Sequence, residues 1–161
     1  MTTTRASKAA GAVSLRAAGA EDVARMTALI AEAHLPPLFI DTFLAGFVVA
    51  ERAGAMLGCG GLEMYAEAGV IRSVVVDPPA HGLGIGRLLA ERLMAAARED
   101  GARELYLFTQ DARDFWAHLG FADVTLDEWS AAPRACWQYQ FISQNPESLP
   151  EIRTMRLQLG S

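Results

Sequence analysis

The sequence predicts an α/β protein with a mixed sheet, and three observations lead to this prediction. Short apolar segments at Phe47–Ala50, Met56–Leu62 and Val70–Val76 have the character of strands joined as an antiparallel meander. A glycine-rich loop and a strongly amphipathic segment, Gly84–Glu99, follow and predict a helix. Beyond this helix, strand and helix patterns alternate toward the end of the chain.

The other elements are assigned from the same periodicities. Val13–Ala17 alternates as a first strand would, and Glu21–Ala33 has apolar residues at helical spacing. Pro36 and Pro37 break the chain, and Leu38–Leu44 is a candidate second short helix. Downstream we expect strands at Glu104–Thr109, Phe121–Thr125 and Ile152–Leu159, a short helix at Ala112–Leu119, and an irregular or helical segment at Asp127–Arg134.

Length and charge limit the classes of protein to consider. The chain has 161 residues, which suits one domain over residues 13–161 after a flexible tail at residues 1–12. Its net charge of -5 gives no bulk attraction to nucleic acid, so we expect no nucleic-acid partner. No apolar run is long enough to span a membrane, and the start is a poor signal peptide, so we expect no membrane partner.

Cysteine and histidine usage predicts neither a disulfide framework nor a metal site. Cys59 and Cys136 lack metal-ligand spacing, and His34, His81 and His118 are scattered. Cys59 is best explained as a small buried core residue. The simplest location for such a chain is the reducing cytoplasm.

The segment from Val76 to Arg87 carries the strongest chemical signal. A predicted strand ends at Val76, a turn with two prolines follows, and Gly82, Gly84 and Gly86 then precede a helix. A helix N-terminus offers free N–H groups and partial positive charge, and glycines let the backbone approach an anion closely. Together they predict a pyrophosphate cradle, to which Arg87 can add a charge-assisted contact.

Two better-known phosphate loops do not fit this spacing. The glycines follow G-x-G-x-G, which differs from the dinucleotide fingerprint G-x-G-x-x-G, and no Lys-Ser/Thr pair follows as in a P-loop. A simple tight turn is the remaining alternative explanation of the glycines.

At this point the chain resembles the GNAT acetyltransferases. HGLGIG at residues 81–86 is similar to their signature at the start of a helix, with His81 in place of the usual Gln or Arg. ARDFWAHLGF at residues 112–121 resembles a second family segment. The resemblance covers about Ser14 to Phe121 and, within the family, is nearest to small amino-acid and arsenic-resistance N-acetyltransferases.

The resemblance implies the GNAT fold, in which helices flank a mostly antiparallel sheet and acetyl-CoA lies in a V-shaped cleft. The backbone of Val74, Val75 and Val76 would pair with the pantetheine chain, and the N–H of Val75 would stabilise the oxyanion. Thr109 and Phe115 would also line the cofactor. The pyrophosphate would lie on the loop residues His81, Gly82, Leu83, Gly84, Ile85, Gly86 and Arg87.

The sequence offers several candidate groups for the base and the acid of the reaction. Removing a proton from an alkyl ammonium requires a base or a water relay, and Glu63 is the main candidate beside Glu67. For each, a solvated edge carboxylate is the alternative explanation. Trp116 stands where the family usually has the tyrosine that protonates the leaving thiolate, and an indole cannot act as that acid. Water, Tyr106 or Tyr139 is a possible substitute; otherwise Trp116 walls the cleft.

Arg72 is the candidate acceptor-binding residue because it lies inside an apolar strand. It binds a substrate carboxylate, forms a salt bridge with Glu63 or Asp123, or lies on an exposed strand face. The predicted function is transfer of acetyl from acetyl-CoA to a small, amino-acid-like primary amine. The alternatives are a peptide or protein N-acetyltransferase and a non-catalytic acetyl-CoA-binding module. A homodimer is possible in any of these cases.

Overall fold

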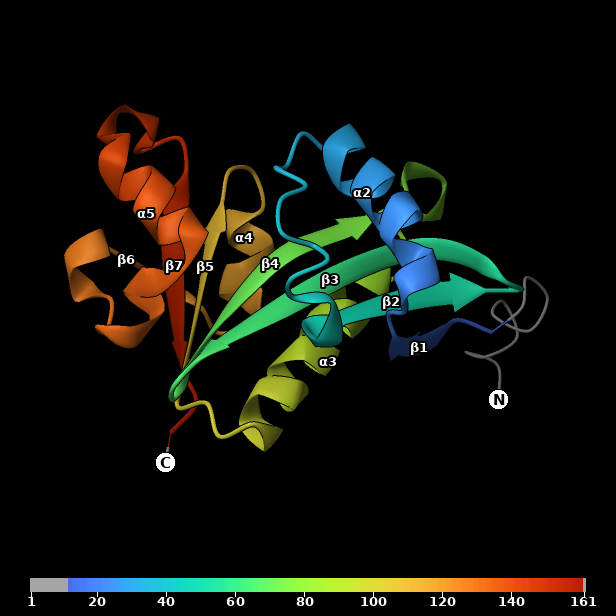
Figure 1. The fold of residues 1–161 in the computed structure, drawn as a ribbon, viewed down its shortest axis with the longest axis horizontal. Helices are drawn as coiled ribbons and strands as arrows, with labels where there is room; N and C mark the ends of the chain where they lie inside the picture. The colour runs from blue at the N-terminus through green and yellow to red at the C-terminus, as the bar shows by residue number, and fades with distance from the viewer. Residues whose placement is uncertain (1–11, 161) are drawn as a thin grey trace. The chain divides into compact units, whose positions relative to one another are not determined.

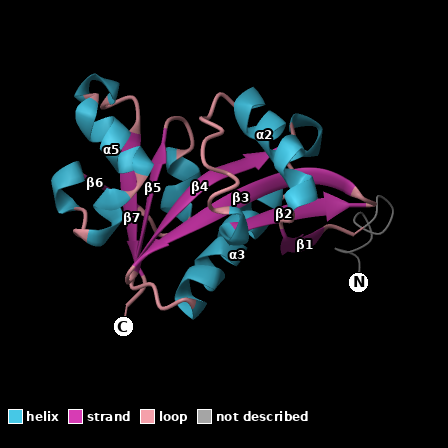
Figure 2. Ribbon diagram, viewed as in Figure 1, coloured by secondary structure: helices cyan, strands magenta, loops and turns pink. Residues whose placement is uncertain are grey.

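The computed structural model describes residues 12–160, so the predicted tail, residues 1–12, lies outside the described residues except for its last position (Figure 1). Within that range the strands form one seven-stranded sheet in the order β1-β2-β3-β4-β5-β7-β6 (Figure 2). The strands are β1 Ser14–Ala17, β2 Phe47–Arg52, β3 Ala55–Tyr65, β4 Ala68–Val76, β5 Glu104–Thr109, β6 Ala122–Val124 and β7 Arg153–Gln158.

The pairing confirms the predicted α/β class with a mixed, mostly antiparallel sheet flanked by helices. Strand β1 pairs antiparallel with β2, β2 with β3, and β7 with both β5 and β6. Strands β4 and β5 pair in parallel over Ala68–Val70 and Glu104–Tyr106. The α-helices are α2 Val23–Glu32, α3 Ile85–Glu99, α4 Arg113–His118 and α5 Trp137–Gln144.

Contacts group the described residues into two compact units, the first of which contains residues 12–62 and 73–93. Helix α2 packs there against strands β2 and β3 (Figure 1). The buried apolar side chains of this contact are Met26, Leu29, Ile30, Phe47, Val49 and Cys59. The neighbours of Cys59 along β3 point to the opposite face. A Cβ at Gly60 would lie 2.9 Å from Leu93 Cδ1, so glycine lets α3 pack closely on this second face.

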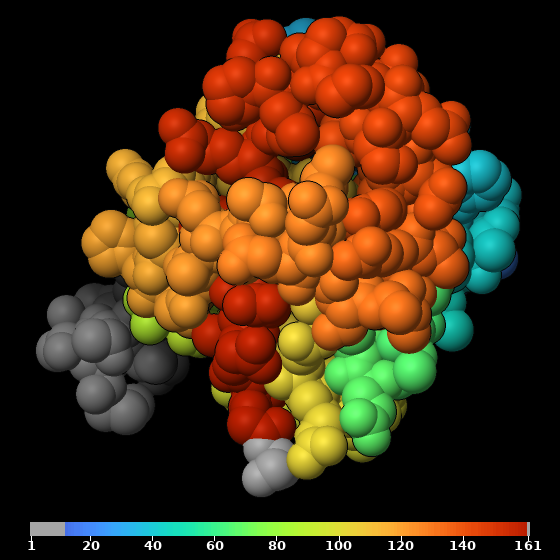
Figure 3. Space-filling view, turned by 90° about the vertical axis from the view of Figure 1, so that its left-hand side faces the viewer, coloured from blue at the N-terminus to red at the C-terminus, as the bar shows by residue number. Residues whose placement is uncertain are grey.

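The second unit contains residues 63–72 and 94–160 and packs around an aromatic cluster. The ring of Trp129 stacks on Tyr106 of β5 at a centroid distance of 4.2 Å and lies 5.1 Å from Tyr139 of α5. Its indole N–H donates to Thr154 Oγ1 of β7 at 2.9 Å. Residues between about 120 and 145, drawn in orange, form much of the visible surface of this unit (Figure 3).

One local prediction needs correction. Leu38–Leu44 is not a helix, because turns lead into the short 3-10 helix Leu44–Gly46. Phe39 has a φ of 60°, in the left-handed region, and the two preceding prolines supply no N–H donors.

Helix α5 was not predicted from the sequence. Its eight residues include Trp137, Tyr139 and Phe141, which are weak helix formers. Its N-cap is Cys136, whose thiol accepts from the backbone N–H of Tyr139 at 3.3 Å. Cysteine is not among the residues that usually mark a helix start, so the sequence carried no capping signal.

Neither a membrane-spanning helix nor a cluster of metal-binding side chains is present in residues 12–160. No helix in this range is both long enough and apolar enough to cross a membrane. No group of three His, Cys, Asp or Glu side chains lies together there as metal ligands would.

Candidate functional site

The glycine-rich loop connects β4 to α3 in the first unit. Asp77 leaves the sheet, the 3-10 helix Pro78–Ala80 follows, and α3 begins at Ile85. Gly82 and Gly84 have φ angles of 86° and 79°, a conformation that a side chain makes unfavourable. A Cβ at either glycine would meet no atom within 4 Å, so the backbone there faces open space.

The N–H groups of this loop are available to a ligand. Leu88 is the first residue after the loop whose N–H donates to a helical carbonyl, that of Gly84 at 3.2 Å. Between Gly82 and Arg87, no backbone N–H donates to an acceptor in the part of the chain that the structure describes. These donors sit at the positive end of a 15-residue helix, which is the arrangement that binds a phosphate or pyrophosphate.

Three contacts fix the loop. The N–H of Asp77 donates to Leu57 O of β3 at 2.8 Å, and Arg25 Nη2 of α2 lies 3.1 Å from Asp77 Oδ2. His81 Nε2 lies 2.7 Å from Val76 O, so this imidazole spans the loop from its far side back to the end of β4. Arg87 pairs with Glu91 at 2.9 Å on the exposed surface of α3.

Strand β4 is distorted just before the valines that were predicted to pair with pantetheine. Ser73 has a φ of 57°, which is unusual for a residue other than glycine within a strand. Every residue from Ala68 to Arg72 is buried, whereas after the distortion Ser73 and Val74 are both half-buried, Val75 is buried and Val76 is half-buried. A local change of this kind redirects the backbone groups of the residues that follow.

Glu63 and Arg72 form a buried ion pair in the second unit. Arg72 Nη1 donates to Glu63 Oε2 at 3.1 Å, and the side chains are 4% and 0% exposed. Of the alternatives for Arg72 considered from the sequence, the salt bridge with Glu63 is present in the structure. The Arg72 guanidinium also lies over the Trp137 ring, 5.7 Å from its centroid.

Tyr65 completes this cluster and was missed from the sequence. Its hydroxyl donates to Glu63 Oε1 at 2.5 Å. Burial and this hydrogen bond raise the pKa of Tyr65 well above its usual range, so the phenol stays protonated. A signal was available: Tyr65 follows Glu63 by two residues in a strand, and such residues share one face.

The residues predicted around the thioester lie on β5 and α4 of the second unit. Thr109 is buried at the end of β5, and its Oγ1 accepts from the N–H of Ala112 at 3.1 Å. Trp116 is 6% exposed and makes edge contacts with Phe115 and Phe121 at 5.0 and 5.3 Å. Trp116 therefore belongs to an aromatic cluster of α4, and Phe115 is its half-buried member.

Gln138 of α5 is a further polar group that the sequence did not single out. Both amide atoms of its side chain are buried and lack a hydrogen-bond partner among the described residues. A buried amide without partners is costly and calls for an explanation, of which an absent ligand is one.

The family is decided by a comparison with known proteins. The model of a family described as the acetyltransferase (GNAT) family matches residues 19–121, more than half of the 161 residues. The chain belongs to the GNAT acetyltransferase family. The match includes both the glycine-rich loop and the Trp116 segment.

Individual relatives agree with this assignment. An amino-acid acetyltransferase of Ralstonia nicotianae is 29% identical over 135 residues, which is 78% of this chain and 30% of that protein. The chain spans between 29% and 41% of the length of the first curated amino-acid acetyltransferases that it matches.

Solved structures show the GNAT fold for this chain. N-acetylglutamate synthase from Neisseria gonorrhoeae, complexed with coenzyme A and N-acetyl-glutamate, has a TM-score of 0.77 at 22% identity. The match covers 92% of this chain and 35% of the synthase chain. Rv2747 from Mycobacterium tuberculosis, in complex with CoA, has a TM-score of 0.75 at 24% identity, with coverage of 91% and 99%.

Proposed function

We propose that this GNAT protein is an acetyl-CoA-dependent N-acetyltransferase that acetylates the primary amine of a small, amino-acid-like acceptor. The observation that carries the proposal is the row of free N–H groups from Gly82 to Arg87 at the start of α3. The amino-acid acetyltransferases among its relatives support the acceptor class. We expect it to act in the cytoplasm, without metal, nucleic-acid or membrane partners.

In this proposal the loop and β4 hold the cosubstrate. The backbone of Gly82–Arg87 binds the pyrophosphate, while His81 keeps the loop closed on Val76 O. Val74, Val75 and Val76 pair with the pantetheine chain, and the N–H of Val75 donates to the thioester carbonyl. Thr109 and Phe115 remain predicted cofactor-lining residues.

The chemical step is attack of a neutral amine on the thioester carbon, with CoA leaving as its thiolate. Holding the two substrates together supplies most of the rate enhancement. Glu63 is the proposed base, and it accepts from the Tyr65 hydroxyl at 2.5 Å, so a proton would reach it through that hydroxyl. A Glu63→Gln variant that lowers the maximal rate with little effect on the KM of acetyl-CoA would support this role; an unchanged maximal rate would contradict it.

Arg72 is the proposed partner of the acceptor carboxylate. A guanidinium offers five N–H donors in a rigid fork, so it can hold a second carboxylate besides that of Glu63. Replacing Arg72 with Ala is expected to raise the KM of the acceptor much more than that of acetyl-CoA. Equal small effects on the two KM values would contradict the assignment.

A non-catalytic acetyl-CoA-binding module is the second candidate, and Trp116 is the observation that favours it. Its buried indole replaces the usual acidic tyrosine. However, a thiol has a pKa of about 8.5, so the thiolate leaves without much assistance. Loss of the tyrosine is therefore compatible with turnover.

The deciding experiment is release of the CoA thiol from acetyl-CoA with a panel of free amino acids, other small amines and short peptides. Release with amino acids supports the proposal, and release with peptides alone would indicate a peptide N-acetyltransferase. If no acceptor supports release while acetyl-CoA still raises the melting temperature, the protein binds acetyl-CoA without transferring its acetyl group to any acceptor of the panel. That result would favour the non-catalytic binding module.

A further inference from the structure

A hollow of about 780 Å³ lies in the second unit, at the start of β4 and β5 and the end of β7. Its volume falls in the range of small-molecule sites, roughly 300–1,000 Å³. Four segments meet around it on the visible surface: the green turn near residue 66, the yellow start of β5, the orange residues near 130 and the red end of β7 (Figure 3). This hollow lies at the amino-terminal end of β4, whereas the phosphate loop follows the carboxyl end of that strand.

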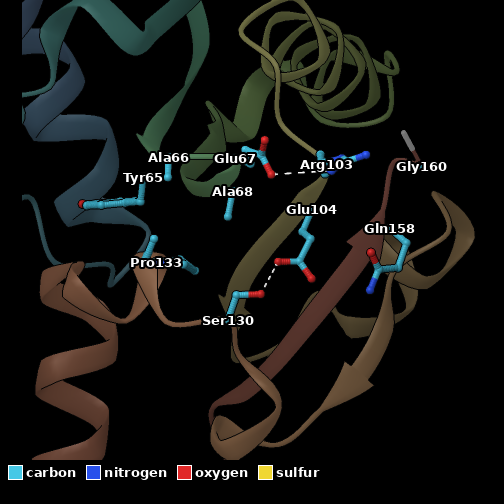
Figure 4. A pocket seen from close by; sticks show the side chains of 11 residues that line it. Tyr65, Ala66, Glu67, Ala68, Arg103, Glu104, Ser130, Pro133, Gln158 and Gly160 are labelled. Carbon is cyan, nitrogen blue, oxygen red and sulfur yellow. Dashed lines mark hydrogen bonds and ion pairs between the residues drawn. The ribbon is translucent and has the colours of Figure 1, made fainter.

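The sheet supplies one row of side chains to the hollow. Glu104 of β5 is the register partner of Ala68 of β4 on one side and of Gln158 of β7 on the other. Register partners share one face of a sheet, so the three side chains point the same way. Because Ala68 is small, it leaves space on one side of the Glu104 carboxylate, and the Gln158 side chain lies on the other side (Figure 4).

Hydrogen bonds from neighbouring side chains hold the Glu104 carboxylate in one orientation. Its Oε1 accepts the hydroxyl of Tyr106 at 3.1 Å and, at short range, that of Ser130. The N–H of Ser130 in turn donates to the Tyr106 hydroxyl at 3.0 Å, and Trp129 stacks on the buried Tyr106 ring. The second oxygen, Oε2, accepts no hydrogen bond from residues 12–160, so one acceptor remains on a carboxylate that cannot turn freely.

The other residues that line the hollow indicate which class of ligand it would bind. Arg103, a cation in the lining, pairs at 3.7 Å with Glu67, and its side chain points away from Glu104 (Figure 4). The lining also includes the small apolar residues Ala66, Ala68, Ala132 and Pro133, which together form an apolar wall. A carboxylate beside an apolar wall suits a cationic head with a short apolar tail.

We infer that this hollow is a second ligand site, which binds a small primary alkylammonium ion with its head on Glu104 and its tail along the apolar wall. Tyr65 lines this hollow and also leads protons to Glu63 in the proposed mechanism, but the head and tail contacts inferred here involve neither Glu63 nor Arg72.

The test uses butylammonium as probe, titrated into the full chain without acetyl-CoA and followed by amide NMR shifts. The shifts of Glu104, Ser130 and Gln158 should move together and saturate. Glu104→Gln should weaken the affinity at least fivefold. Ala132→Phe, which fills the apolar side without touching a charge, should do the same. Thermal unfolding of each variant verifies that it is folded.

Matched controls separate a site from general charge attraction. Glu67→Gln removes an exposed carboxylate at the same rim and should change the affinity less than twofold. Butyrate and butanol, which share the tail but lack the cation, should cause no saturating shifts. Equal losses for the Glu67 and Glu104 variants, equal binding of butanol, or shifts confined to other residues would overturn the inference. Because no acetyl transfer is measured, failure here leaves the proposed enzyme activity standing.

Discussion

Glu63 and Arg72 place two opposite charges in the core of the second unit. Removing one member leaves the other buried without compensation, which typically costs about 3–5 kcal/mol. We therefore expect Glu63→Ala and Arg72→Ala each to lower the free energy of unfolding by about that amount. The double variant should lose much less than the sum, because it leaves no lone charge. Urea unfolding of the three variants measures these free energies. If the losses of the two single variants simply add up in the double variant, the interaction between Glu63 and Arg72 contributes nothing to the free energy of unfolding.

Asp22 is a second buried carboxylate whose charge depends on a partner. Hydrogen bonds from Arg16 at 2.7 and 2.8 Å lower its pKa to about 2 from 3.8, against the opposing effect of burial. The N–H of Gly19 adds a bond of 2.8 Å. The lowered pKa means that the stability is fully present above about pH 4 and is lost as the pH falls through about 2.

Asp22→Asn should therefore cost about 1–2 kcal/mol at pH 7, a figure reduced for the partly exposed Arg16. The difference from the wild type should shrink steadily below pH 4. Asp114→Asn serves as control, because that side chain is 89% exposed and should not change the pH dependence. A difference for Asp22→Asn that stays constant down to pH 2 would contradict the assigned pKa.

At the scale of elements, the loop between β4 and α3 combines two requirements at one glycine. Gly84 has a positive φ, and its surface is open, as the proposed approach of a pyrophosphate requires. Gly54, in the turn between β2 and β3, has nearly the same φ, 81° against 79°, and the same open space. The two positions are therefore matched for backbone strain and differ in their relation to the loop.

We expect Gly84→Ala and Gly54→Ala to lower stability by similar amounts, about 1–2 kcal/mol. Only Gly84→Ala should raise the KM of acetyl-CoA, at least tenfold, since a methyl group and a shifted backbone both disturb the row of N–H donors. Initial rates at varied acetyl-CoA would measure this. An equal KM effect in both variants would mean that strain, and not the loop, is responsible.

Elements also differ in how well the sequence predicts them. Strand β5 runs over Glu104–Thr109 in both the prediction and the structure, because its apolar residues form one short continuous run that glycine and polar residues bound. Helix α5 was missed because its aromatic residues favour no helix and its cap is a cysteine. Leu38–Leu44 was misjudged because its periodicity is helical while the backbone at Phe39 is left-handed.

At the scale of the whole molecule, the prediction of one domain over residues 13–161 can be measured. All three tryptophans, Trp116, Trp129 and Trp137, lie in the second unit, so fluorescence reports on that unit alone. Circular dichroism reports on both units. If residues 13–161 are one domain, the two signals should give the same urea midpoint. Separate midpoints would contradict the prediction and show that the units unfold independently.

The sequence by itself determined the glycine-rich loop and the family to which its pattern points. A strand end, spaced glycines and a helix start are neighbours along the chain, so local backbone preferences are enough to form that site. The tertiary structure decided the rest. In the tertiary structure Arg72 pairs with Glu63, and Trp129 stacks on Tyr106. Ser130 donates a hydrogen bond to Glu104, which lies 26 residues earlier in the chain. Such contacts depend on the packing of distant segments, which no local pattern records.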